Sequence, residues 1–465
     1  MKAILFFDDW LVSRAQGLER RWYEPVFVKQ LIDRFHPESL GYGGYYSVFF
    51  DERLGSYVMY LAVYPPEADP GTFVLRLTSA DPHHWENPSF DVQASPTWKG
   101  FKNVLVHEKN DRFWPLVTRS LANTAFADWG YVATCIPADT QDQHSYLAFS
   151  KDGLHFQIDY AHPWHQARSD TWSGVTWNAK RELFQIATRP VNVDRRVATI
   201  TTQDFKHFSP PETILQPDAL DPLGSEIYSM PIFSYEDLFL ALPHLYFTDP
   251  FETATRIKWR GRIESHLAYS YNGFNWYRPQ RKAFIGTQVY GLQGGGQNYA
   301  IEMLHHDHKL LFFTSATPGE HAAYEDLQRD GKCTAGFFAP LLYEMRLDGF
   351  CSLKTSSREG ILQTKSIIAK SAELTLNLRT TAHSSVRIQI LDGETLEPLP
   401  GYLLEEAIPI SGDHLFIRPR WQQRADLSEL LGKPIRLELY LCEAEVFAIR
   451  LEHQIFIGRT PTEDL

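Results

Sequence analysis

The stretch SKDGLHFQ (residues 150–157) joins a serine, an aspartate and a glycine ahead of an aromatic residue. Aspartate and glycine tolerate the left-handed backbone that tight turns between antiparallel strands require. The same plan recurs elsewhere: a strand ends in a small or polar residue, an Asp- or Asn-containing turn follows, and then an aromatic residue or leucine. These copies are SADPHHWENP from Ser79, TTQDFKHFSPP from Thr201, SYNGFNWYRP from Ser270 and RLDGFCSL from Arg346.

The spacing of these five turns predicts a repeat architecture. Successive copies begin about 50 to 75 residues apart, and each interval holds enough alternating apolar and polar sequence for a four-stranded sheet. Five such sheets predict a five-bladed β-propeller over residues 1–352.

The sequence changes character after Leu353, where turns rich in Asp, Asn and Trp become rare. Strand-like segments follow one another at 372–380, 385–392, 414–421, 434–441 and 445–452. This pattern predicts an antiparallel β-sandwich over residues 353–465. The expected fold class is therefore all-β, with short helices expected only at 26–35 and 426–433.

Composition excludes several classes of partner. The formal net charge is −12 and no run of Lys or Arg occurs, which argues against binding of nucleic acid or of an anionic membrane. The four cysteines form no CxxC pair, so the sequence predicts neither a zinc site nor a disulfide framework.

The N-terminal segment MKAILFFDDWLV has a short apolar run that two aspartates interrupt. Such a run is too short for a signal peptide or a membrane span. We therefore expect a soluble, cytoplasmic protein.

Two acidic residues occupy matching places in consecutive repeats. Asp170 precedes the strand–turn–strand segment GVTW-NAKR-ELFQIAT, and Glu226 precedes the segment SMPIF-SYED-LFLAL. The innermost strand of each propeller blade begins at the central channel, so residues just before these strands converge there. Partial burial at such a place would raise the pKa of a carboxyl group, as proton donation requires.

The motifs RSDTW, with Asp170, and SEIYSMP, with Glu226, resemble the Arg-Asp-Pro and Glu-Cys-Pro motifs of the five-bladed glycosidases related to family 32. That group comprises invertases, levanases and their arabinanase relatives. The resemblance covers nearly the whole chain, although its motifs are loose. It implies that Glu226 is the general acid and that Asp170 stabilises an oxocarbenium-like transition state.

The sequence departs from that family in blade one, where an aspartate nucleophile should precede the first hairpin. The preceding stretch here is LGYGG, which contains no acid. The remaining candidates are Asp8 and Asp9, on an expected opening strand, and Glu38. Strand alternation allows at most one of Asp8 and Asp9 to face the channel. Asp51 lies in the hairpin turn, where we expect a structural role.

Further residues are expected to contact a sugar. Arg189 ends the second strand of the blade that holds Asp170, and Gln297 or Gln293 in GLQGGGQNY offers neutral hydrogen bonds. The segment HPWH (162–165) is a further candidate for substrate contact. Aromatic platforms for stacking are expected at Trp10, Trp129, Trp172 and Tyr228. The cluster HHDH (305–308) lies at a turn where consecutive side chains splay apart, so no metal and no cofactor are expected.

The most direct interpretation is a glycoside hydrolase that acts on an oligosaccharide, and the resemblance favours a fructosyl or arabinosyl furanoside. Carboxylate separation, about 5 Å or about 6.5–9.5 Å, would decide between retention and inversion. One alternative is a phosphorylase or transglycosylase on the same scaffold, which would need a phosphate pocket of converging arginines. The candidates for that pocket are Arg189, Arg195, Arg196 and Arg262. Another alternative is a sugar-binding propeller without catalysis.

Overall fold

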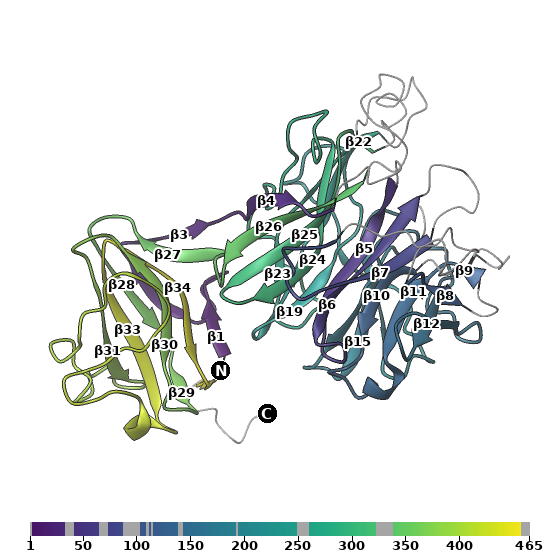
Figure 1. The fold of residues 1–465 in the computed structure, drawn as a ribbon. Coiled ribbons are helices and arrows are strands. Elements are labelled where there is room, and N and C mark those ends of the chain that lie inside the picture. Colours follow the sequence, from purple (N-terminus) through teal and green to yellow (C-terminus); the bar gives the residue numbers. More distant parts are fainter. Residues whose placement is uncertain are drawn as a thin grey trace. The chain divides into compact units, whose positions relative to one another are not determined.

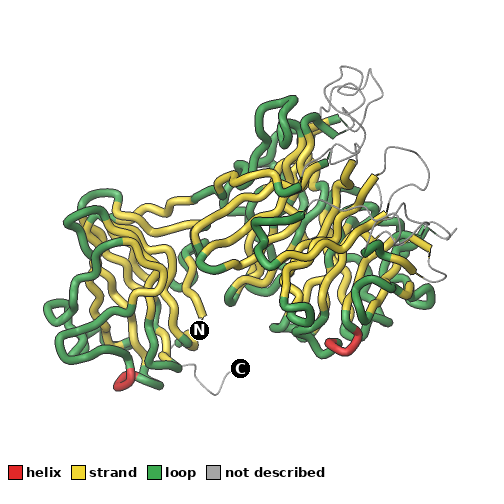
Figure 2. Tube along the Cα trace, in the orientation of Figure 1, coloured by secondary structure: helices red, strands yellow, loops and turns green. Residues whose placement is uncertain are grey.

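The structure is a computed structural model in which strands dominate (Figure 2). It describes residues 2–32, 41–64, 73–86, 103–107, 111–112, 115–137, 143–191, 194–248, 260–321 and 338–456. The helical elements within these ranges are two single 3-10 turns, Ala127–Trp129 and Ser428–Leu430. No helix in the described ranges has the length and apolar character needed to cross a membrane.

The chain divides into two compact units. The larger unit comprises residues 25–306 and 311–344, and the smaller unit comprises residues 1–24, 307–310 and 345–465.

The larger unit contains five antiparallel sheets that follow one another along the chain (Figure 1). Sheet one has β5 (Gly41–Asp51), β6 (Ser56–Tyr64) and β7 (Phe73–Ser79). Sheet two has β10 (Pro115–Ser120), β11 (Tyr131–Cys135), β12 (Tyr146–Ser150) and β13 (Gln157–Ile158). Sheet three has β14 (Val175–Asn178), β15 (Leu183–Thr188), β16 (Val197–Thr202) and β17 (Glu212–Leu215).

Sheets four and five complete the series. Sheet four has β19 (Ile232–Tyr235), β20 (Leu238–Ala241) and β23 (Ala268–Ser270). Sheet five has β24 (Gln297–His306), β25 (Lys309–Thr317), β26 (Ala339–Arg346) and the early strand β4 (Val26–Gln30). A two-stranded ribbon, β8 (Val106–His107) with β9 (Asp111–Arg112), lies outside these sheets.

The first strands of sheets one to four contact one another in chain order, and the first strand of sheet five contacts that of sheet one. β5 contacts β10, β10 contacts β14, β14 contacts β19, and β24 returns to contact β5. The early strand β4 closes the last sheet, because Phe27 pairs with Tyr343 of β26. These contacts confirm the expected five-bladed propeller, and we call the five sheets blades one to five.

Blade four carries an insertion that matters for the site. β18 (Ser225–Ile227), β21 (His244–Thr248) and β22 (Gly261–Ser265) pair in this order and extend the sheet of blade five to seven strands. Strand β22 runs parallel to β24, with Ile263 opposite Gln297. The insertion therefore bridges blades four and five, and it carries Glu226 at its edge.

The repeated turn has a common hydrogen-bond pattern in three blades. An Asp or Asn side-chain oxygen accepts the backbone N–H groups two and three residues further on, each at 2.9 Å. A Ser or Thr hydroxyl two residues before it accepts a third N–H group at 2.9 Å. The acceptors are Asp152, Asp204 and Asn272, preceded by Ser150, Thr202 and Ser270. Blade one has a related turn at Ser79 and Asp81.

The expected fifth copy, at Arg346, is not a propeller turn. Its Asp348 belongs to the smaller unit, where it is buried and forms an ion pair with Arg450. The sequence similarity arose because any tight Asp-Gly turn between strands has the same composition.

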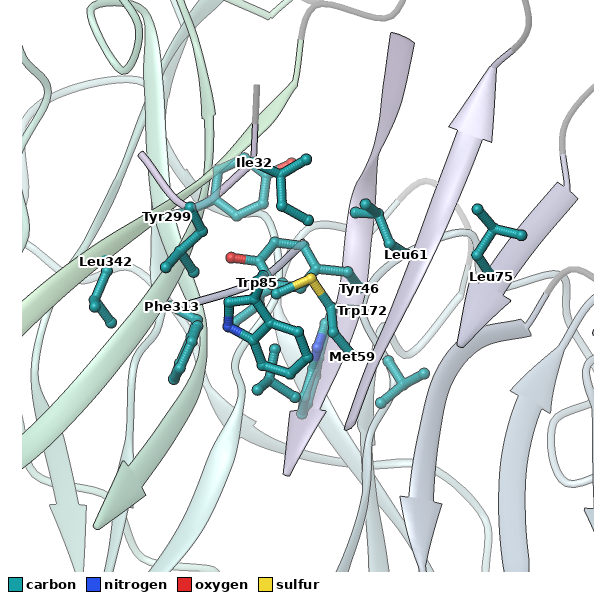
Figure 3. Close-up of a cluster of buried hydrophobic side chains, with 14 of the residues drawn as sticks. Ile32, Tyr46, Met59, Leu61, Leu75, Trp85, Trp172, Tyr299, Phe313 and Leu342 are labelled. Atoms are coloured by element: carbon teal, nitrogen blue, oxygen red, sulfur yellow. The ribbon is translucent and has the colours of Figure 1, made fainter. Parts of the chain in front are cut away.

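The propeller core is apolar around blades one and five. Side chains from β5, β6 and β7 meet side chains from β24, β25 and β26, and Trp172 of blade three joins them (Figure 3). Tyr46, Met59, Trp85 and Trp172 lie at the middle of this cluster. Trp172 is fully buried, so the predicted stacking platform is instead part of the core.

The smaller unit is the expected antiparallel β-sandwich, with two sheets. One sheet contains β1 (Lys2–Leu5), β3 (Leu18–Trp22), β27 (Cys351–Thr355), β30 (Thr375–Thr380), β32 (Asp413–Ile417) and β34 (Ala444–Leu451). The other contains β2 (Val12–Gln16), β28 (Glu359–Thr364), β29 (Ile367–Ala369), β31 (Val386–Asp392), β33 (Pro434–Cys442) and β35 (His453–Ile455).

Three expectations about the fold were wrong: one domain boundary and two helices. Residues 1–24 group with the sandwich, because β1 pairs with β34, β2 with β28 and β3 with β27. Within the expected helix 26–35, Val26–Gln30 is a strand, because pairing with β26 overrides the local helical pattern. The expected helix 426–433 is reduced to one 3-10 turn, Ser428–Leu430.

Candidate active site

Asp170 lies at the entrance to the first strand of blade three, as expected. Short hydrogen bonds fix the backbone around it: Ser169 Oγ and Thr188 Oγ1 are 2.7 Å apart, and Thr171 Oγ1 donates to the Tyr228 carbonyl at 2.7 Å. The Asp170 side chain is 55% exposed, and its Oδ1 lies 2.9 Å from Nη1 of the buried Arg189. The predicted partnership of Arg189 with a carboxylate is confirmed.

Glu226 occupies β18 of the blade-four insertion. The following segment forms the expected hairpin, with Ile232 to Tyr235 paired with Leu238 to Ala241 around a left-handed Glu236. The Glu226 side chain is 39% exposed, and its Oε2 lies 2.7 Å from Nη1 of Arg195, whose side chain is 10% exposed. Glu226 and Asp170 thus have the same arrangement: an open carboxylate held by a largely buried guanidinium.

Tyr228 joins these two ion pairs. The Arg189 guanidinium lies 5.2 Å from the centre of the Tyr228 ring, and the Arg195 guanidinium lies 5.8 Å from it. Such cation–aromatic contacts are attractive, and they hold both guanidinium groups against one ring. The contacts therefore run from Asp170 through Arg189, Tyr228 and Arg195 to Glu226, which brings the two predicted acids into one cluster. We call these five residues the acid cluster.

Aromatic side chains surround the acid cluster. The Tyr246 ring packs edge-on to Tyr228 at 5.8 Å, and Arg195 lies 4.8 Å from the Tyr246 ring centre. His321 lies near both hydroxyl groups, with its ring nitrogens 3.4 Å from Tyr228 Oη and from Tyr246 Oη. Tyr228 and His321 are partly exposed and offer faces on which a sugar ring could stack, whereas Tyr246 is fully buried and supports them from beneath.

Blade one contributes a phenol where an acid was sought. Tyr45, on β5, lies within electrostatic reach of Arg189 and Asp170, and burial raises its pKa well above the usual value for tyrosine. Its hydroxyl is buried and has no hydrogen-bond partner among the described residues. Such a hydroxyl is costly to leave unpaired, so a ligand oxygen would be a favourable partner.

A buried carboxylate that the sequence analysis missed lies on the first strand of blade five. Glu302 Oε1 is 2.6 Å from Nη1 of Arg119 on β10, so this ion pair joins blades two and five. Burial raises the pKa of Glu302 to about 7 despite Arg119. Arg119 also lies 5.2 Å from the Trp172 ring centre. The one available signal was an acid within the apolar strand sequence NYAIEML.

The N-terminal acids are placed in the sandwich unit. Asp8 and Asp9 lie in the bend after β1 rather than on a strand, so the alternation argument does not apply to them. Asp9 forms an ion pair with Arg20, and Asp8 Oδ1 accepts the Trp10 backbone N–H at 2.8 Å. Trp10 is half exposed, and the Lys365 ammonium lies 5.0 Å from its ring centre.

These placements correct the prediction for Asp8 and Asp9, which make their described contacts in the sandwich rather than in the propeller. The prediction failed because three strand pairings, all distant in sequence, take residues 1–24 into the sandwich. Glu38 lies outside the described residues. Asp51 is buried and accepts hydrogen bonds from the Tyr131 hydroxyl and from the Arg53 backbone, which agrees with the structural role expected for it.

Two other residues predicted to contact a sugar make their described contacts outside the acid cluster. Trp129 packs with Phe126, Phe149 and Phe205 between blades two and three. Gln297 is buried at the start of β24, where its backbone pairs with β22.

The neighbouring glutamine and the HPWH segment support the backbone. Gln293 donates its side-chain amide to the Ala316 carbonyl. In HPWH, His165 is buried with Nε2 3.0 Å from the Arg189 carbonyl, so it supports the chain at Arg189. Burial lowers the pKa of His165, which favours a neutral ring that donates to this carbonyl.

No family model and no curated protein matches this chain. Solved structures show a distant likeness. A GH32 β-fructofuranosidase from Bombyx mori is 12% identical with a TM-score of 0.40, over 94% of this chain and 95% of that one. An α-L-arabinofuranosidase from Fusarium graminearum is 11% identical with a TM-score of 0.37, over 71% and 99%.

An N-acetylgalactosamine deacetylase from F. plautii is 12% identical with a TM-score of 0.44, over 72% of this chain and 97% of that one. These values are too low to assign an activity or a substrate to this chain. What the molecule itself offers is a cluster of two half-exposed carboxylates, two largely buried guanidinium groups and several aromatic rings at the first strands of a five-bladed propeller.

Proposed function

We propose that the chain is a glycoside hydrolase whose active site is the acid cluster. The observation that carries this proposal is that Arg189 and Arg195 both lie against the Tyr228 ring, and that each holds a carboxylate from a different blade. Hydrolysis of a glycosidic bond needs such a pair of acids, one on the leaving oxygen and one facing the sugar. Partial exposure leaves both carboxylates accessible, while the largely buried arginines fix their positions.

In this proposal, Glu226 is the general acid and Asp170 is the carboxylate that stays ionised. Arg195 Nη1 donates a hydrogen bond to Glu226 Oε2. This contact must break before Glu226 can donate a proton to a substrate oxygen. Arg189 holds the Asp170 carboxylate in place, and this carboxylate would stabilise positive charge that develops on the sugar. The Tyr45 hydroxyl would donate a hydrogen bond to the sugar or accept one from it.

The charge balance favours a neutral sugar and hydrolysis over phosphorolysis. Within the acid cluster, the charges of Asp170 and Glu226 offset those of Arg189 and Arg195. Of the other arginines considered for a phosphate pocket, Arg196 pairs with Asp194 and Arg262 lies near Glu264. No surplus cation among these four residues remains for inorganic phosphate. A furanoside substrate, fructosyl or arabinosyl, remains the leading expectation from the sequence resemblance.

A sugar-binding propeller without catalysis is the second candidate, and a specific observation favours it. Blade one presents the phenol of Tyr45 near Asp170 and Arg189, and its described acids Asp51 and Asp81 make their observed contacts elsewhere. The two candidates differ in turnover and not in sugar binding.

The test uses a panel of fructosyl and arabinosyl oligosaccharides and aryl furanosides, with products measured by chromatography. The variants are Glu226→Gln and Asp170→Asn, and Glu212→Gln on the exposed strand β17 serves as the control. A hydrolase loses about 100-fold or more in kcat in the first two variants and keeps its activity in the control. Sugar binding by calorimetry without turnover of any substrate would establish the binder instead.

A further inference from the structure

A second group of chemically active side chains lies in the propeller unit and shares no residue with the acid cluster. Asp81 and His83 follow β7 of blade one, and His306 ends β24 of blade five. One ligand atom from each of these three residues lies within 4.8 Å of the other two, and all three side chains are partly buried. The rings of His83 and His306 are 5.4 Å apart between centroids.

Comparison with the same turn in blades two and three shows that the turn does not require His83. In blades two and three, the turn aspartate contacts the Nδ1 atom of a histidine three residues later, at 2.6 Å for Asp152–His155 and 2.7 Å for Asp204–His207. Blade one keeps this pair as Asp81–His84, also at 2.6 Å. The residue before the histidine is Leu154 in blade two and Lys206 in blade three, whereas blade one has His83. The turn therefore forms without a histidine at that place.

Each of the two histidine rings has a nitrogen within hydrogen-bond distance of a protein oxygen, as metal-binding histidines usually do. His83 places Nδ1 2.9 Å from Asp81 Oδ1 and Nε2 2.6 Å from Glu344 Oε1 on β26. His306 places Nδ1 2.8 Å from the Tyr57 hydroxyl on β6. Histidine ligands usually bind the metal through one nitrogen and donate the other N–H to a carboxylate or another oxygen, which fixes the tautomer.

The donor set of the cluster also suits a cation, because Asp81 offers a carboxylate oxygen and His83 and His306 each offer a ring nitrogen. Two imidazoles with one carboxylate make a donor set that suits first-row divalent metals, with zinc the commonest example.

We propose that Asp81, His83 and His306 bind one divalent first-row transition metal ion, with zinc as the reference ion. Ligand atoms around tetrahedral zinc lie about 3.4 Å apart, so small side-chain rotations from the present separations would complete the site. A water molecule would fill the fourth position, since Asp81 is 45% exposed. The ion would join blade one to blade five, whose first strands β5 and β24 are in contact, and so would strengthen the closure of the ring.

The HHDH segment thus contributes to a metal site through a single residue. His306 lies beside Asp81 and His83, whereas His308 packs against Phe416 of the sandwich unit. The two histidines therefore have different surroundings, although no metal was expected at this segment. The partners of His306 come from another blade, which no local motif could indicate.

The experiment is zinc binding by the full chain after treatment with EDTA and buffer exchange. Calorimetry measures the stoichiometry and affinity, Co²⁺ substitution gives the absorption bands of a tetrahedral site, and thermal unfolding is recorded with and without ZnCl₂. We expect one zinc per chain and a higher Tm in its presence, because a ligand that binds only the folded state stabilises it.

Two variants and two controls decide the outcome. His83→Leu reproduces the blade-two sequence and so keeps the turn, and His306→Gln removes the second imidazole. Both should bind zinc at least tenfold more weakly and lose the Tm increase. The controls His155→Gln and His207→Gln alter exposed histidines of the sister turns and should bind zinc as the wild type does. Absence of stoichiometric zinc in the wild type, or undiminished binding by His83→Leu, would overturn the proposal.

Discussion

The Asp348–Arg450 pair of the sandwich and the two ion pairs of the acid cluster in the propeller differ in how exposed their carboxylates are. In the sandwich, Asp348 and Arg450 form an ion pair in which the side chains are 0% and 6% exposed. In the propeller, the largely buried Arg189 and Arg195 hold carboxylates that are 55% and 39% exposed. A pair buried on both sides fixes structure, whereas a pair open on the carboxylate side can exchange its partner for a ligand. This difference separates the candidate active site from the structural ion pairs.

The sandwich shows the closed arrangement again at Glu445. This carboxylate is 4% exposed and accepts hydrogen bonds from Tyr23, from Ser352 and from Arg379. These bonds, against the effect of burial, lower the pKa of Glu445. Every oxygen that could bind a ligand is already occupied by a partner from the same unit.

The largest effect that the comparison predicts is on turnover. Glu226→Gln should reduce kcat by about 10²- to 10⁴-fold, because it removes the proton donor while keeping the shape of the side chain. Its free energy of unfolding should change by less than about 1 kcal/mol, since the pair is solvent-exposed on the acid side. Steady-state kinetics and urea unfolding measure the two quantities. Normal turnover in Glu226→Gln would contradict the view that an ion pair with an exposed carboxylate serves catalysis while one buried on both sides serves structure.

The Asp348–Arg450 pair, which is buried on both sides, should show its effect in stability. Arg450→Met leaves Asp348 buried without its partner, and this should destabilise the sandwich unit by about 3–5 kcal/mol. Urea denaturation followed by intrinsic fluorescence measures the loss. Arg418→Met, which breaks the exposed pair with Glu373, is the matched control and should cost less than about 1 kcal/mol. Equal losses in both variants would contradict the comparison.

Glu302 extends the comparison because it is a carboxyl group that is buried inside the propeller unit. Burial raises the pKa of Glu302 to about 7, well above the usual value for a glutamate, so the folded state holds this proton more tightly than the unfolded state does. Stability from this group is complete below about pH 4.5, and it falls as the pH rises to about 7, by up to about 3 kcal/mol.

The measurement compares the unfolding free energies of the wild type and Glu302→Gln between pH 4.5 and 8. The wild-type value should fall relative to that of the variant as the pH rises, and the difference should level off above pH 7. A difference that does not change with pH would show that Glu302 is ionised in the folded protein throughout.

The smallest effect concerns Tyr45. Tyr45→Phe should leave stability within about 1 kcal/mol of the wild type, because the deleted hydroxyl has no partner among the described residues. If the hydroxyl serves a sugar, KM should rise several-fold, since the bond forms only with substrate. Tyr46→Phe is the control, because its hydroxyl donates to the Thr314 carbonyl at 2.8 Å and so serves the fold. An unchanged KM in Tyr45→Phe would exclude Tyr45 from the binding site.

Local features of the sequence predicted much of this structure. Alternation predicted strands such as Val386–Asp392 and Pro434–Cys442, because a half-buried strand shows its two faces in its own residues. The turns at Asp152, Asp204 and Asn272 were predicted because their hydrogen bonds close within three residues. The matched places of Asp170 and Glu226 were found because each acid precedes its own hairpin.

Contacts between distant residues could not be predicted in this way. Phe27 lies in a strand because its backbone pairs with Tyr343 of the last blade, although the sequence around Phe27 is equally suited to a helix. Asp8 and Asp9 follow a strand whose partner is β34 near the other end of the chain. Glu302 depends on Arg119 for its partner, and the two residues lie in different blades.

The sequence by itself determined the all-β character, the repeated turns and the two acids that enter the acid cluster, because these depend on hydrogen bonds and burial patterns within one hairpin. Only the tertiary structure decided which strand closes the ring, that residues 1–24 join the sandwich, and that His83 meets His306. Those outcomes depend on which backbone edges and polar side chains remain unpaired once the local hairpins have formed, and that is a property of the assembled sheets rather than of any single segment.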